Sequence, residues 1–158
     1  VCNKYEIDIK ANDNFEKISR DLSNLASEKI IDNISGIFDD NIKFVNQDHN
    51  EATYADKIRK NESIINWNTS AENLLGKING LYPNPGACFY HNGVRYKILD
   101  AEVDDHFGEV GFVLKTPLII GCKHKSIKVL KIQRSGKSPQ NIEDFVNGSR
   151  IKAGTDLN

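Results

Sequence analysis

Basic side chains gather at two places in the chain, where they could bind an anionic polymer. The larger set lies between positions 123 and 137 and comprises Lys123, Lys125, Lys128, Lys131, Arg134 and Lys137. The smaller set comprises Lys57, Arg59 and Lys60. Nucleic-acid phosphates attract such sets through counterion release, without any readout of sequence. For a single lysine, a solvated surface charge is the commoner role, so the prediction of a nucleic-acid interface depends on the sets as a whole.

The net charge also differs between the two parts of the chain, and the part that contains both basic sets is the positive one. Residues 1–56 hold 6 Lys and Arg against 12 Asp and Glu, a net charge of −6, and residues 57–158 hold 15 against 10, a net charge of +5. The sum is the overall net charge of −1. This asymmetry favours an anionic partner for the second part. Two ordinary solvated surfaces remain the alternative.

Other candidate chemistry is weaker. The string 135–138 (Ser-Gly-Lys-Ser) ends like a phosphate-binding P-loop, but that motif needs a glycine where this chain has Lys131. The four histidines do not share metal-ligand spacing. We expect Cys122 to be a buried thiol, His124 an exposed imidazole, and Asp104-Asp105 a solvated turn. The sequence therefore predicts no catalytic and no metal-binding residue.

The strand that would carry the larger basic set belongs to a predicted series of short strands. Pro83, Pro85 and Gly86 form a rigid turn after a helix that begins with the capping box of Thr69 and Glu72. The dipeptide Asn92-Gly93 is typical of a type I′ hairpin. Strands are predicted over 87–91, 94–103, 112–114, 118–122 and 126–133, followed by a short helix that ends at Gly148. Five short strands indicate a small barrel of the OB type.

The first part of the chain has a different pattern. Tyr5, Ile7 and Ile9 alternate with charged residues, which predicts an edge strand. Asp13 and Glu16 resemble a capping box for an amphipathic helix that runs to about residue 37, either unbroken or in two pieces. A lone strand and helix cannot form a core, so we expect the tail of a larger α/β domain. The predicted division is 1–46, a linker at 47–63, and 64–158.

Composition limits the setting of the protein. Three cysteines among 158 residues are an odd number, which favours a reducing compartment. No apolar run reaches the roughly 20 residues that a transmembrane helix needs. The chain begins at Val1 without a charged and then apolar leader, so we expect no signal peptide and a fragment of something longer.

The order and spacing of several motifs resemble the C-terminal portion of the methionyl-tRNA formyltransferase family. These motifs are Gln47–Lys57, Ile65–Trp67, Ser70–Glu72, Lys77–Ile78, Tyr82–Ala87, Asn92–Gly93, Lys97–Ile98, Ala101–Val103, Gly136–Pro139, Glu143–Phe145 and Gly148–Gly154. The resemblance covers nearly the whole chain. Two positions depart from the family pattern: Asn66 stands where an acidic residue is usual, and Asn84 where a tryptophan is usual.

The resemblance implies a Rossmann-like formyl-transfer domain, ending at residue 46, followed by an OB-like domain that binds tRNA. The family moves a formyl group from 10-formyltetrahydrofolate to the amino group of methionyl initiator tRNA, in the bacterial cytoplasm. Its catalytic residues would precede Val1, so this portion is expected to bind without catalysing, as a monomer. The family has a lysine in its interdomain linker, and the resemblance implies that Lys57 corresponds to it. A formyltransferase that acts on an amino-sugar nucleotide, or a non-enzymatic OB module that binds nucleic acid, remains an alternative.

Overall fold

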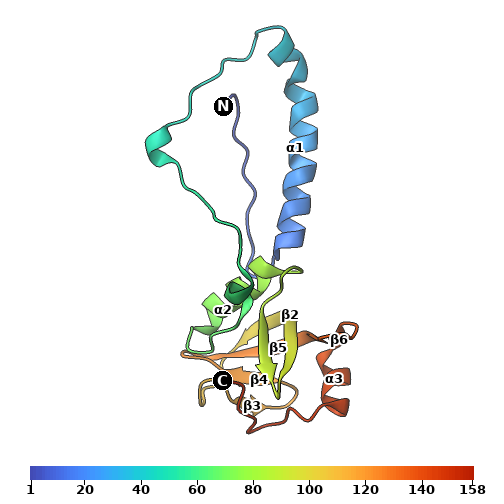
Figure 1. Cartoon of the computed structure of the whole chain (residues 1–158). Helices are drawn as coiled ribbons and strands as arrows, with labels where there is room; N and C mark the ends of the chain where they lie inside the picture. Colours follow the sequence, from blue (N-terminus) through green and yellow to red (C-terminus); the bar gives the residue numbers. More distant parts are fainter. The chain divides into compact units, whose positions relative to one another are not determined.

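The computed structural model describes residues 1–158 and divides into two compact units, Val1–Ile58 and Arg59–Asn158 (Figure 1).

Unit 1 is built on one unbroken helix, α1 (Phe15–Phe38). The predicted helix is confirmed, but its cap is Asn14, whose side-chain oxygen accepts a hydrogen bond from the Lys17 amide at 3.0 Å. Asp13, the predicted cap, accepts the Lys10 amide instead. No residue of α1 is buried, and Phe38 is 82% exposed. A short 3₁₀ turn, η1 (His49–Glu51), follows in the same unit.

The strand predicted over residues 5–9 is wrong. Residues 1–10 pair with no other strand, because unit 1 contains no sheet that could take up their backbone groups. The first half of this segment is held by other contacts. The Val1 amino group donates to the Val45 carbonyl at 2.6 Å, and Asn33 donates to the Tyr5 hydroxyl at 3.1 Å.

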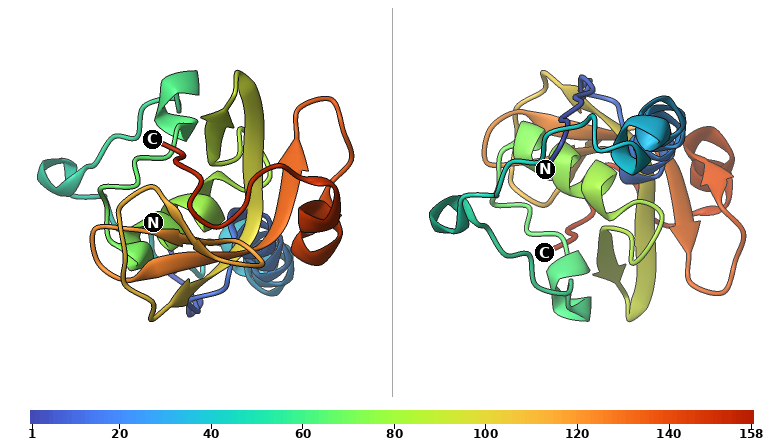
Figure 2. Two further views of the ribbon diagram at one scale, coloured as in Figure 1. Left: turned by 90° about the horizontal axis from the view of Figure 1, so that it is seen from below. Right: turned by 90° about the horizontal axis from the view of Figure 1, so that it is seen from above.

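Unit 2 contains one antiparallel sheet with two helices packed against it (Figures 1 and 2). Its elements are η2 (Lys60–Ser63), α2 (Ala71–Leu81), β1 (Cys88–His91), β2 (Val94–Asp104), β3 (Val113–Lys115), β4 (Ile119–Gly121), β5 (Ser126–Arg134), β6 (Gln140–Asn141) and α3 (Ile142–Gly148). The strand order is β1-β2-β5-β4-β3, and β6 pairs with β5. Helix α2 packs against β2 and β5, and α3 packs against β5 and β6. The five predicted strands and the Asn92-Gly93 hairpin are confirmed, and β6 is additional.

The predicted OB-like barrel of five strands is corrected to an open sheet of six strands, because β1 and β3, at the two ends of the strand order, do not pair. Other backbone segments cover these two edges instead. The Ile65 amide donates to the Cys88 carbonyl of β1 at 2.8 Å. The Val113 amide of β3 donates to the Thr155 carbonyl at 2.9 Å. Non-sheet segments thus take hydrogen bonds that closure of the barrel would have used.

The two long strands, β2 and β5, change their inward face at the same place. On β2 the buried residues are Tyr96 and Ile98, and then Ala101, one position out of alternation. On β5 the buried apolar residues are Ile127 and Val129, and then Ile132, which is again one position out of alternation. The register shifts on either side of Asp100 account for both slips. Such bulges bend a strand, so β2 and β5 curve together around the core.

A row of aromatic rings lines this core. Ring centroids are 5.8 Å apart for Trp67 and Phe89, 5.4 Å for Phe89 and Tyr96, and 5.8 Å for Tyr96 and Phe145. Trp67 is 3% exposed, and its indole nitrogen donates to the Leu157 carbonyl at 3.0 Å. This contact attaches the last residues of the chain to the segment that precedes α2.

Candidate nucleic-acid interface

The smaller predicted basic set straddles the boundary between the two units. Lys57 is exposed in unit 1, and Arg59 and Lys60 are exposed at the start of unit 2. The backbone at the latter two residues is anchored. The Arg59 amide donates to the Glu62 carboxylate at 2.7 Å, and the Lys60 carbonyl accepts from the buried Ser63 hydroxyl at 2.6 Å. Arg59 thus caps η2, and Lys60 is its first residue.

The larger predicted set lies on β5 and its two flanking loops. Lys128, Lys131 and Arg134 belong to β5, Lys123 and Lys125 precede the strand, and Lys137 follows it. Four of the six side chains are exposed and form no ion pair: Lys123, Lys131, Arg134 and Lys137. These four are the cations that are open to an anionic ligand.

Strand β5 distributes its charges over two faces. Lys128 lies opposite Glu102, and Lys131 lies opposite Asp100, on the outer face of the sheet. Arg134 lies opposite the inward-facing Tyr96, two positions beyond the buried Ile132. On a regular strand, side chains three residues apart would alternate between the two faces. The slip between Val129 and Ile132 instead puts Lys128 and Lys131 on the same face and leaves Arg134 on the other.

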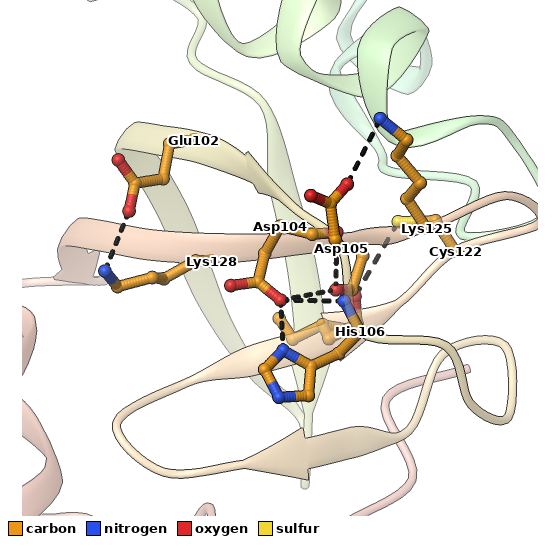
Figure 3. A network of polar contacts seen from close by, with 9 residues as sticks. Glu102, Asp104, Asp105, His106, Cys122, Lys125 and Lys128 are labelled. Carbon is orange, nitrogen blue, oxygen red and sulfur yellow. Dashed lines mark hydrogen bonds and ion pairs between the residues drawn. The ribbon is translucent and has the colours of Figure 1, made fainter.

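Two of the predicted residues are already neutralised by carboxylates (Figure 3). The Lys128 ammonium lies 2.7 Å from Glu102, and hydrogen bonding to that carboxylate raises the pKa of Lys128. The Lys125 ammonium lies 3.3 Å from Asp105 and 3.4 Å from Glu72. Hydrogen bonding, first to Asp105 and then to Glu72, raises the pKa of Lys125. Both lysines would have to exchange a carboxylate for a phosphate.

The expectation of a solvated turn at Asp104-Asp105 is wrong for Asp104, which ends β2, whereas Asp105 is exposed and pairs with Lys125. Asp104 accepts from the Ser126 hydroxyl at 3.2 Å, from the His106 amide at 3.0 Å and from the His106 ring (Figure 3). Partial burial disfavours its charged form, but the hydrogen bonds from His106 and Ser126 outweigh burial and hold the pKa of Asp104 below its ordinary value. Ser126 is fully buried, so this network closes the end of β2 against the start of β5.

No catalytic constellation emerges from these groups. Burial raises the pKa of the Cys122 thiol to about 11, so the thiolate is not a ready nucleophile. The prediction that Cys122 is buried and His124 exposed is confirmed. No group of three or more His, Cys, Asp and Glu side chains is arranged to hold a metal ion. None of the helices is both long and apolar enough to cross a membrane.

The structure adds a groove that sequence reasoning missed. It has a volume of about 780 Å³ and lies between the β1–β2 hairpin, the β5–β6 loop and the end of α3. Two of the predicted cations, Arg134 and Lys137, line it together with Arg150, which the sequence reading did not include among the basic sites. Arg150 stands alone among uncharged neighbours at 147–151, so no local charge pattern marked it.

Comparison with known proteins places this unit in a family. Residues 57–150 match the model described as the formyl transferase C-terminal domain. The methionyl-tRNA formyltransferase of Pelagibacter ubique is 54% identical over 156 residues, which are 98% of this chain and 50% of that protein. The methionyl-tRNA formyltransferase of Rickettsia massiliae is 36% identical over 99% of this chain and 52% of that protein. This chain therefore spans about half the length of these relatives.

Solved structures show the same fold in a more distant protein. HypX from Aquifex aeolicus superposes with a TM-score of 0.68 at 13% identity, over 90% of this chain and 27% of that chain. A second HypX structure, described as a complex with tetrahydrofolic acid, superposes with a TM-score of 0.59 at 16% identity, over 75% of this chain and 22% of that chain.

Proposed function

Since the chain belongs to the formyl transferase family through its C-terminal domain, we propose that it is the C-terminal half of a methionyl-tRNA formyltransferase. The intact enzyme transfers a formyl group from 10-formyltetrahydrofolate to the amino group of methionyl initiator tRNA, for translation initiation in the cytoplasm. The names of the relatives support this reaction, and the tetrahydrofolic acid of the HypX complex supports a folate donor. The formyl-transfer chemistry belongs to the half of the protein that this chain does not include.

The division of labour along the chain follows from this proposal. Residues 1–46 complete the formyl-transfer domain, 47–63 connect it, and 64–158 form the tRNA-binding domain. The exposed apolar side chains of α1, such as Ile31 at 73% and Phe38 at 82%, support the first assignment. An apolar helix face of this kind needs a partner surface. The preceding half of the relatives supplies enough chain for one.

The observation that carries the tRNA-binding role is the set of unpaired cations around β5. Lys123, Lys131, Arg134 and Lys137 are exposed and have no carboxylate partner, whereas Lys125 and Lys128 are paired. An unpaired ammonium or guanidinium gives up no ion pair when it binds a phosphate. Lys57, Arg59 and Lys60, which are exposed in the connecting segment, add further cations to the proposal.

Binding of initiator tRNA to the 158-residue chain, titrated at several salt concentrations, tests the proposal. The expected result is an affinity that falls steeply between about 50 and 200 mM salt, with a log–log slope that reports the number of phosphates neutralised. A binding curve that salt does not move, or no binding at low salt, would overturn the tRNA-binding role. The closely similar relative from Pelagibacter ubique offers a full-length protein for assays with methionyl-tRNA and with an amino-sugar nucleotide as acceptors.

A further inference from the structure

We propose that the groove beside α3 binds one unstacked nucleotide of an RNA strand, an inference that rests on the RNA-binding role proposed above. The groove is lined by three elements that are distant in sequence, and their side chains combine cations, hydrogen-bonding groups and an aromatic floor. The lining residues used in the argument are His91, Asn92, Tyr96, Arg134, Lys137 and Arg150, with Asp144 opposite.

The size of the groove suits a nucleotide. Its volume of about 780 Å³ falls within the range of roughly 300–1,000 Å³ that is typical of small-molecule sites. A single phosphate ion would leave most of this space unfilled. The groove therefore has room for a whole nucleotide.

The charges of the groove are unpaired and converge from three places. Arg134 ends β5, Lys137 lies in the β5–β6 loop, and Arg150 follows α3. None of the three side chains forms an ion pair or a hydrogen bond, whereas the nearby Lys128 is paired with Glu102. Two arginines and a lysine without carboxylates are suited to a phosphate, because a guanidinium can bind two phosphate oxygens at once.

The backbone that carries these cations is held in place. The Lys137 amide donates to the Arg134 carbonyl at 3.0 Å, and the Gln133 side chain donates to the Lys137 carbonyl at 2.9 Å. Gly136 has a φ of +75°, which closes this turn. On the opposite wall, the Ile151 amide donates to the Ser149 hydroxyl at 3.0 Å and fixes the residues around Arg150. A site with a fixed frame loses less entropy when a ligand binds.

The remaining lining groups fit a base and a sugar better than a bare anion. Asp144 on α3 is the one acidic side chain of the lining, and it would repel an isolated phosphate while accepting hydrogen bonds from an amino group or a 2′-hydroxyl. Asn92 adds an amide at the rim, where it contacts the His91 ring at 3.0 Å. The occupant must therefore be anionic at one end and a hydrogen-bond donor at the other, as a nucleotide is.

An RNA strand provides such a group where a nucleotide leaves the stack. Proteins read RNA mainly at loops, bulges and ends, where the base edges are free. The outer-face cation Lys131 lies three residues before Arg134 on β5. Backbone contacts on the outer face of the sheet can thus continue into the groove at the end of the same strand.

The test uses the 158-residue chain and short labelled RNAs at one low salt concentration. A single-stranded pentaribonucleotide is compared with a blunt RNA duplex and with inorganic phosphate as a competitor. We expect the single strand to bind more tightly than the duplex, and free phosphate to compete poorly. Arg150→Ala and Lys137→Ala should each weaken single-strand binding by about tenfold, the effect of one lost charged hydrogen bond.

The matched control is Lys115→Ala. Lys115 is exposed on β3, at the opposite end of the sheet from β1, and it does not line the groove. Its substitution removes the same charge and should leave single-strand affinity within about twofold. Arg150→Lys should restore part of the lost affinity, and unchanged thermal denaturation verifies that each variant folds.

Equal losses in Arg150→Ala and Lys115→Ala would overturn the groove assignment, as would a duplex that binds as well as the single strand. Effective competition by inorganic phosphate would also overturn it, in favour of a simple anion site. Each of these results would still allow salt-dependent binding of tRNA to the unmodified chain. If the proposed function itself were wrong, tRNA would not bind the unmodified chain at all, so the two failures can be distinguished.

Discussion

Glu102 on β2 and Lys128 on β5 are direct cross-strand neighbours, with 2.7 Å between carboxylate and ammonium. Both side chains are partly exposed, so water screens this pair and RNA can reach it. The pair therefore limits how strongly Lys128 can act as a phosphate ligand. This relationship leads to the first prediction.

Removing the Glu102 charge should strengthen RNA binding. Glu102→Gln frees Lys128, lowers its raised pKa towards the ordinary value, and makes one more cation available. We expect the slope of log affinity against log salt to steepen by about 1 for tRNA. Glu51→Gln, which removes an equal charge in unit 1, is the control. Equal effects of the two substitutions would show that net charge, and not the pair, determines affinity.

Stability at acid pH should depend on Asp104. Its pKa is depressed in the folded state, so its contribution is present above the unfolded value and is lost as pH falls through the folded value. The groups that lower the pKa of Asp104 are His106 and Ser126, and the Asp104 charge in turn acts on Lys128. In thermal denaturation between about pH 6 and 3, the Tm should thus fall as the pH drops below 3.8, the ordinary pKa of an aspartate.

In the variant Asp104→Asn, this fall of the Tm at acid pH should be smaller. At neutral pH it should lower stability by about 1 kcal/mol, because a charged acceptor for His106 and Ser126 is lost. That corresponds to a Tm shift of about 4–8 °C for a domain of this size. Asp100→Asn on the same strand has no such partners and is the control. If the Tm of Asp104→Asn fell as steeply at acid pH as that of the unmodified chain, another carboxylate would be the cause of the fall.

Two glycines should respond to alanine in opposite directions. Gly86 has a φ of +78°, and an added Cβ would lie 2.9 Å from Lys97 Cδ and 3.3 Å from the Pro83 carbonyl oxygen. Gly86→Ala should therefore destabilise unit 2 by about 1–2 kcal/mol. Gly76 is exposed inside α2 with nothing within 4 Å, so Gly76→Ala should stabilise it by about 0.5–1 kcal/mol. Urea denaturation of both variants measures the contrast, which the same sign of change in both would contradict.

The indole of Trp67 should hold the end of the chain. Trp67→Phe removes the donor to the Leu157 carbonyl and leaves a gap, so we expect a loss of about 2–4 kcal/mol. Residues around Thr155 should also become more accessible to protease, because their pairing with Val113 is then less well supported. Tyr90→Phe, at a half-exposed ring, is the comparison. Unchanged proteolysis at the end of the chain would place the effect of Trp67 in the core alone.

Local sequence patterns predicted the strands of unit 2 well and their bends poorly. Asn92-Gly93 specifies its hairpin through local turn geometry, which depends on no distant residue. The slip at Asp100 depends on how β2 and β5 pair, and the open ends of the sheet depend on segments such as 153–156 that show no strand pattern of their own. Alternation at Tyr5–Ile9 looked like a strand, but a strand requires a neighbour that unit 1 does not contain.

The candidate site shows the same limit. The basic positions could be identified from composition, but their pairing could not, because Glu102 and Lys128 are 26 residues apart and meet only through strand register. Arg150 was missed because the groove forms only when the end of α3 meets the β5–β6 loop. Asp104 acquires its partners in the same way, from Ser126 on the neighbouring strand.

The slip in β5 also bears on the path of an RNA strand. Lys128 and Lys131 point outward, while Arg134 opens into the groove on the side of Tyr96. A backbone that touched all three in turn could not run straight along the strand. It would have to cross the rim of the sheet between Lys131 and Arg134, so the protein would impose a sharp change of direction on its ligand. RNA that is already bent or looped would follow this route at less cost than a rigid helix.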